Sequence, residues 1–362
     1  MNFNDAQVLH LRMSKEDQAL YKKNKAKFNK FISHNNSKAR NNAKRKTCYT
    51  CNEPYTSFCN SHSVPKFCLK GIAVDGKVRI SGLQEELPIM GEDSGVEKAG
   101  TFHLICRHCD STLFQDYENP NAYSIKPTGK ILAQIAMKNY LQVISERLFK
   151  KELYKIIRQD YPDSQEEMNY QIATIEMDLL DYQDAYKRAK TASSGNHDEW
   201  YYLCYYQKLN YVVPVATQSS IALISDFEDN VINNLYDFPP NYKLQEINVA
   251  IFPLENESVV MLFIDSRNKR YRNFYKQLNN LPLPDQLAAI NYIVLSYTEN
   301  VFLSPKIDES VFKNPNFLST CQKSTIVLSN SIYSDSLKAA IDAFTLSKRN
   351  SIPNLLSKDF SL

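Results

Sequence analysis

The sequence predicts an α+β protein: a small zinc domain, then a helical segment, then a mixed, mainly antiparallel α+β domain. Three observations support this prediction. Two CxxC pairs enclose residues 48–109, apolar residues recur at helical spacing from residue 128, and β-forming stretches follow residue 200. Because helical and strand segments are clustered and do not alternate regularly, α+β is favoured over a doubly wound parallel sheet.

We expect four regions, because 362 residues exceed one comfortable hydrophobic core. The first two are a basic N-terminal helix and linker over residues 1–47 and the zinc domain over 48–126. They are followed by the helical segment over 127–195 and by the C-terminal α+β domain over 196–362, to which no motif assigns a role.

Local patterns predict individual elements. Asp75-Gly76 has the composition of a hairpin turn, and residues 85–100 indicate an irregular loop. Thr128 is the expected N-cap of the first long helix, and Ser164 with Glu167 forms a capping box for the second. Further on, Glu255-Asn256 predicts a second hairpin turn, and helices are expected at residues 269–281, 285–295 and 336–346.

The N-terminal region is strongly basic. The segment Lys15–Thr47, called the basic arm below, holds eleven lysines or arginines and two carboxylates, a local net charge of +9 in a chain of +3. Such a charge can neutralise a phosphate backbone, or it can simply be a solvated helix and tether. Its position directly before the cysteine motifs favours nucleic acid. The candidate contacts are Lys44, Arg45, Lys46 and, further along, Lys66.

Cysteine usage indicates a metal site. Eight cysteines are too few for a disulfide scaffold, and four of them form the pairs Cys48/Cys51 and Cys106/Cys109. Each CxxC places two thiolates on one side of a metal ion, and two pairs complete the tetrahedron that Zn²⁺ prefers. We therefore expect one structural zinc ion on these four residues. The alternative is four unpaired buried cysteines.

The order of motifs resembles a known family. CYTC, SHSVPKFCLK and LICRHCD follow one another as in the zinc-stabilised His-Me finger, or HNH-type, nucleases, over about residues 48–121. The resemblance implies a ββα, treble-clef-like unit that holds one Mg²⁺ or Mn²⁺ ion on a nucleic-acid phosphate. It also implies that His62, at the position of the first motif histidine, is the general base on the attacking water.

Three positions depart from the family pattern. The residue before the motif histidine, often a cation ligand, is Ser61. An Asn expected before the second CxxC is Thr101, and the His or Asn that commonly follows the last cysteine is Asp110. The carboxylate of Asp110 suits Mg²⁺, but an acidic residue in the first helical turn also needs no metal. Likewise, His62 is either the base or a packed histidine that bonds its own loop.

Two functions are therefore expected. The first is a metal-dependent endonuclease with His62 and Asp110 as catalytic residues, and the resemblance implies a role in bacterial defence against phage. The second is a catalytically inactive zinc module that binds nucleic acid or a protein. A protein partner or a second copy would use the C-terminal domain. The sequence holds no signal peptide and no membrane-spanning run, so we expect a cytoplasmic protein without membrane contact.

Overall fold

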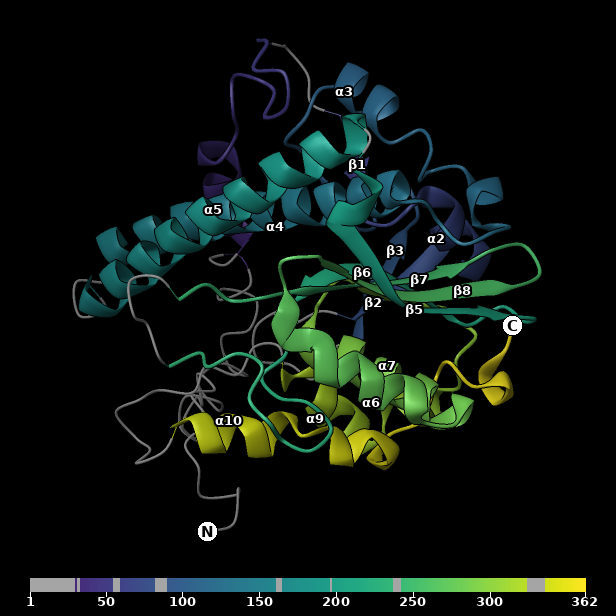
Figure 1. The fold of residues 1–362 in the computed structure, drawn as a ribbon. Coiled ribbons are helices and arrows are strands. Elements are labelled where there is room, and N and C mark those ends of the chain that lie inside the picture. Colours follow the sequence, from purple (N-terminus) through teal and green to yellow (C-terminus); the bar gives the residue numbers. More distant parts are fainter. Residues whose placement is uncertain are drawn as a thin grey trace.

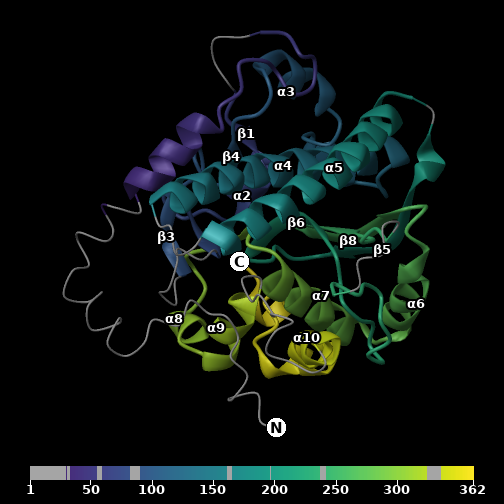
Figure 2. The same ribbon diagram turned by 90° about the vertical axis from the view of Figure 1, so that its left-hand side faces the viewer.

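A central β-sheet lies between two layers of helices in the computed structural model (Figures 1 and 2). The structure describes residues 30, 33–54, 59–81, 90–160, 165–195, 197–236, 242–323 and 336–362. Strands pair antiparallel throughout this part of the chain. The predicted α+β class is thereby confirmed.

The CxxC region, residues 48–126, contains a two-stranded sheet whose second strand leads into a helix. Strand β1 (Ser61–His62) pairs antiparallel with β4 (Thr101–Phe102), and His62 lies opposite Thr101. Helix α3 (Arg107–Leu113) follows β4, with Cys106 as its N-cap. The connection between the two strands holds α2 (Lys66–Ile72), β2 (Lys77–Ser81) and β3 (Met90–Gly95).

The excursion between the CxxC pairs joins the main sheet. At the expected turn, Asp75 and Gly76 both have positive φ (49° and 71°), and Val74 bridges Lys77, as in a tight hairpin. The strand that follows, β2, pairs with β3 on one side and with β9 (Val301–Leu303) on the other. The sheet therefore crosses the boundary predicted at residue 126. Strand β3 also occupies part of the segment expected to be an irregular loop.

Two long helices cover one face of the sheet. Helices α4 (Gly129–Asp160) and α5 (Gln165–Ser194) pack side by side, as the helical segment predicted (Figure 1). Residues 131–141 of α4 are buried on every side, because the CxxC region covers one flank of the helix and the sheet the other. Lys138 lies in this buried stretch.

Part of the expected linker is helical. Residues 33–42, predicted as a polar tether, form a helix. Its Arg40 guanidinium stacks 5.5 Å from the centre of the Phe149 ring on α4. This contact gives the helix a packing partner that a polar linker sequence did not suggest. Residues 1–29, which include the first part of the basic arm, lie outside the described residues.

Among the described residues, seven strands form the main sheet in the order β3-β2-β9-β6-β7-β8-β5. Its central strands are buried on both faces and are therefore almost continuously apolar. Residues Pro253 and Ser258 pair across the predicted Glu255-Asn256 turn, which confirms that hairpin. The strands not yet given are β5 (Tyr201–Leu209), β6 (Val215–Ile221), β7 (Ile247–Pro253) and β8 (Ser258–Asp265).

Shorter helices cover the other face of the sheet. They are α6 (Arg272–Asn280), α7 (Leu283–Tyr297), α8 (Glu309–Phe312), α9 (Pro315–Cys321) and α10 (Ser336–Phe344). Three of them match the helices expected from the sequence. A second apolar core lies between this layer and the sheet, separate from the core shared by α4, α5 and the CxxC region. No helix within the described ranges has the length and apolarity needed to cross a bilayer.

Candidate functional site

The four predicted metal ligands come together. The sulfur atoms of Cys48, Cys51, Cys106 and Cys109 all lie within 4.8 Å of one another. Zinc–sulfur bonds of about 2.3 Å in a tetrahedron would separate the sulfurs by roughly 3.8 Å. The observed Cys51–Cys106 Sγ separation of 4.0 Å is close to this value. The cluster can therefore hold a structural metal ion such as zinc.

Backbone amides also point at these sulfurs. The Cys106 amide donates to Cys48 Sγ (3.3 Å), and the Cys109 amide donates to Cys106 Sγ (3.4 Å) at the start of α3. Burial alone would raise the pKa of Cys48, but backbone amides of Cys51, Cys106 and Thr50 lower it to about 7. The pKa values of Cys51 and Cys109 are raised instead, at Cys109 mainly by burial. The protein by itself therefore favours the thiolate form at Cys48, whereas a metal ion would need thiolates at all four cysteines.

Asp110 lies beside the cysteine cluster but faces a different group of side chains. Its carboxylate accepts hydrogen bonds from Ser61 Oγ (2.6 Å), Lys138 Nζ (2.8 Å) and Cys59 Sγ (3.3 Å). The carboxylate is largely buried, with a side-chain exposure of 17 %. Ser61 and Asp110, predicted as the two positions flanking a cation, are thus brought into direct contact.

An ammonium group bonds both of them. Lys138, from α4, is fully buried, and its Nζ lies 2.9 Å from Ser61 Oγ, 2.8 Å from Asp110 and 3.2 Å from Glu118. It also lies 3.8 Å from the centre of the Phe114 ring. A buried charge is costly unless paired, and these partners together satisfy it. We call Lys138, Ser61, Asp110 and Glu118 the lysine site.

The lysine site keeps Asp110 ionised. Burial by itself would raise the pKa of the Asp110 carboxyl, but the charge of Lys138 and hydrogen bonds from Lys138, Ser61 and Cys59 outweigh it. The pKa therefore lies below its usual value. The resulting carboxylate is neutralised locally by an ammonium group of the protein itself.

His62 points away from the lysine site. Successive side chains of a strand face opposite sides, so Ser61 and His62 of β1 cannot share a face. The His62 ring lies beside the segment that follows β3, and its Nε2 lies 2.9 Å from the carbonyl oxygen of Val96. The structure thus does not bring His62 and Asp110 to one side of β1. It gives His62 a backbone partner in its own region.

The candidate nucleic-acid contacts fall into two groups. Lys44 and Lys46 are exposed, while Arg45 bonds the Thr47 carbonyl and stacks on the Tyr49 ring at 5.1 Å. These three residues follow the helix at 33–42 and lead into the first CxxC pair. Lys66 lies elsewhere and forms an ion pair with Glu97 at 2.5 Å. The first group lies at the C-terminal end of the basic arm.

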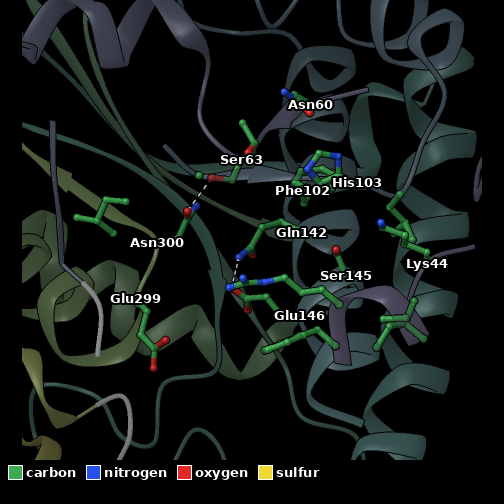
Figure 3. Close-up of a pocket in the computed structure, with 18 of the residues that line it drawn as sticks. Lys44, Asn60, Ser63, Phe102, His103, Gln142, Ser145, Glu146, Glu299 and Asn300 are labelled. Carbon is green, nitrogen blue, oxygen red and sulfur yellow. Dashed lines mark hydrogen bonds between the residues drawn. The ribbon is translucent and has the colours of Figure 1, made fainter. Parts of the chain in front are cut away.

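A pocket of about 1000 Å³ lies between the helix at 33–42, α4 and residues 100–104, which include β4 (Figure 3). Its lining includes Arg40 and Lys44 but neither His62 nor Asp110. Sequence reasoning missed both this pocket and Lys138. The only sequence signal for Lys138 was that it is the single charge in residues 131–141 of α4, which are apolar except for Gln134, Lys138 and Asn139.

Comparison with known proteins identifies no family for this chain. No protein-family description, curated protein or solved structure matches this chain.

Proposed function

We propose that this protein is a zinc-stabilised nucleic-acid-binding protein, in which a lysine ammonium replaces the catalytic cation of an HNH-type site. One observation carries the proposal. Ser61 and Asp110 stand at the two positions where the resembled nucleases hold their cation, and both bond Nζ of Lys138. The ammonium fills the place that the resemblance gives to Mg²⁺.

The replacement has a chemical consequence. A divalent cation beside a buried ammonium group would experience strong repulsion, because little solvent screens charges there. An ammonium group donates hydrogen bonds, but it has no open coordination position at which to activate a water molecule. His62, turned toward Val96, would then be a packed histidine and not a general base.

Zinc on the four cysteines has a structural role in this proposal. All four positions of a tetrahedron would be taken by thiolates, which leaves none for water or substrate. The ion would tie the segment before β1 to the start of α3. A cytoplasmic location agrees with this chemistry, since a reducing compartment keeps such thiolates from forming disulfides.

Nucleic-acid binding rests on charge. The basic arm concentrates a net charge of +9 in a chain of +3, so the remainder carries −6. Its described end, with Lys44, Arg45 and Lys46, adjoins the pocket and the cysteine cluster. The positive charge of the basic arm favours contact with the phosphates of a nucleic acid.

A cation-dependent HNH-type endonuclease, active in phage defence, is the second candidate. The observation in its favour is the chain order of β1, β4 and α3 around the cysteine cluster, the ββα arrangement expected from the resemblance. In this candidate His62 is the base, and Asp110 binds Mg²⁺ or Mn²⁺ after Lys138 moves away.

One experiment separates the two candidates. The purified protein, with its zinc content measured, is titrated into labelled DNA and RNA and is also incubated with plasmid and Mg²⁺ or Mn²⁺. We expect salt-dependent binding and no cleavage, identical for the wild type and His62→Ala. Cleavage by the wild type that His62→Ala abolishes would replace our proposal with the nuclease. Absence of binding to any nucleic acid would reject both.

A further inference from the structure

The pocket beside the basic arm carries opposite charges on separate walls. Arg40 lies in the helix at 33–42, and Lys44 follows that helix. Glu146 lies in α4. In Figure 3, Lys44 and His103 lie on one side and Glu299 and Asn300 on the opposite side, with Gln142 and Glu146 between them. A ligand that spans the pocket would meet cations at one end and acceptors at the other.

The cationic wall is not neutralised by the protein. Lys44 donates to the amide oxygen of Asn41 (2.9 Å), and Arg40 stacks on Phe149. Neither side chain forms an ion pair with any of the residues that the structure describes. Burial, and secondarily the charge of Lys44, lowers the pKa of His103 on the same wall. This wall suits a phosphate group.

The middle of the pocket, with Gln142 and Glu146, and its far side, with Glu299, offer acceptors. Gln142 donates to one carboxylate oxygen of Glu146 (2.6 Å), and because each carboxylate oxygen has two lone pairs, both oxygens can still accept from a ligand. Neither Glu146 nor Glu299 has a lysine or arginine within ion-pair distance in the described ranges. Burial raises the pKa of the Glu146 carboxyl, and in its ionised form this group accepts hydrogen bonds and donates none. The matching ligand therefore presents N–H donors to these acceptors.

Aromatic side chains complete the lining. Phe102, Phe149 and Phe302 contribute to the pocket together with the polar walls. Phe102 and Phe302 are buried core side chains, and the Phe149 ring carries the Arg40 guanidinium, so these rings give the pocket an apolar floor. The volume, about 1000 Å³, is enough for a nucleotide.

We infer that the pocket binds a guanine nucleotide, with its phosphate at Arg40 and Lys44 and its base edge at Glu146. Guanine presents two adjacent N–H donors, N1–H and the N2 amino group, on one edge, which matches a carboxylate. Adenine and cytosine place a ring acceptor beside their amino group and would face Glu146 with an unfavourable lone pair. The nucleotide is either free or part of a single strand.

The strand-bound form of this inference rests on the proposed function. The pocket inference and the proposed function can nevertheless fail separately. Isothermal titration calorimetry with the full-length zinc-loaded protein compares guanosine 5′-monophosphate with the adenosine, cytidine and uridine monophosphates, and with guanosine itself. A parallel titration compares a single-stranded oligothymidine with the same strand carrying one central guanine. The two titrations distinguish a free nucleotide from a base within a strand.

Three variants test the two walls. Glu146→Gln should weaken guanine binding by roughly five- to a hundredfold, the range for a lost bidentate base contact, and should remove the preference over adenine. Arg40→Ala and Lys44→Ala should weaken binding of the monophosphate but leave that of guanosine unchanged. Glu166→Gln on α5 and Lys276→Ala on α6, both exposed and outside the pocket lining, are matched controls that should leave guanine binding unchanged.

Each possible result of the titrations either supports or overturns the guanine-binding inference. Guanine preference in either titration that disappears in Glu146→Gln supports the inference. Equal affinity for all four nucleotides, or a guanine preference that survives in Glu146→Gln, overturns it. Binding of oligothymidine without any guanine preference overturns the pocket inference while leaving the proposed function intact. Guanosine monophosphate binding with no strand binding supports the pocket and rejects the proposed function.

Discussion

Nζ of Lys138 lies 2.8 Å from Oδ1 of Asp110, in a place without solvent access to the lysine. The pair links α4 to α3, and Ser61 on β1 bonds both partners. Three segments that are distant in sequence thus meet at one buried charge. Because the partners neutralise one another only when the CxxC region is docked on α4, the pair also specifies how these parts pack.

Removing the buried charge should destabilise the fold. Lys138→Met leaves the Asp110 carboxylate buried without its cation, and breaking such a pair costs about 3–5 kcal/mol of unfolding free energy. Lys151→Met, which breaks the surface pair with Glu176 (2.7 Å), is the matched control and should cost about 1 kcal/mol or less. Urea unfolding followed by circular dichroism measures both. Equal losses would contradict the importance of the lysine site.

The double variant sharpens this prediction. Lys138→Met combined with Asp110→Asn removes both charges, so the loss should be smaller than the sum of the two single losses. Additive losses would mean that the two side chains do not interact in solution, contrary to the 2.8 Å contact.

Metal removal should unfold the CxxC region selectively. We expect one zinc ion per chain by elemental analysis, and Cys106→Ser should lower this content and the melting temperature, because three thiolates hold zinc less tightly than four. Cys321→Ser, outside the cluster, is the control and should leave one zinc ion bound. Zinc content equal in both variants would show that the cluster is not the metal site.

Stability should decrease between mildly acidic and neutral pH because of Glu246. Burial raises the pKa of this carboxyl from 4.5 to about 7, and a hydrogen bond from Ser220 Oγ (2.9 Å) offsets only part of the effect. The folded protein therefore holds the proton more tightly than the unfolded chain. The stabilisation is full below pH 4.5 and is lost as the pH rises through 7.

The variant Glu246→Gln tests this assignment. A neutral amide cannot ionise, so the variant should lose this part of the pH dependence and should be relatively more stable above pH 7. Chemical denaturation at a series of pH values measures the slope for both proteins. The same slope in wild type and variant would assign the pH dependence to another group.

Salt dependence should reveal the phosphate contacts. Replacing Lys44, Arg45 and Lys46 together by alanine should reduce the slope of log affinity against log salt by about 0.9 for each lost contact with duplex DNA. Fluorescence anisotropy with a labelled duplex at several salt concentrations measures it. Lys358→Ala, exposed near the C-terminus, is the control and should leave the slope unchanged. A slope unaffected by the triple variant would place the contacts elsewhere.

Much of the architecture was predictable from local pattern. The α4 and α5 helices, the β7–β8 hairpin and the clustering of four cysteines follow from periodicity, turn residues and CxxC spacing, all of which act over short distances. The partners of β2 were not predictable. Strand β9 lies more than two hundred residues away, and a short strand carries no mark of which distant edge it will pair with.

The sequence by itself determined the class of the fold, the four cysteines that could hold a metal ion, and the place of His62 and Asp110 near them in the chain. Only the tertiary structure decided which groups these residues face. Ser61 and His62 are neighbours in sequence, yet the strand turns one toward the lysine site and the other toward Val96. Lys138 reaches Asp110 only because α4 packs against α3 and β1, a consequence of burying apolar surface across the whole chain.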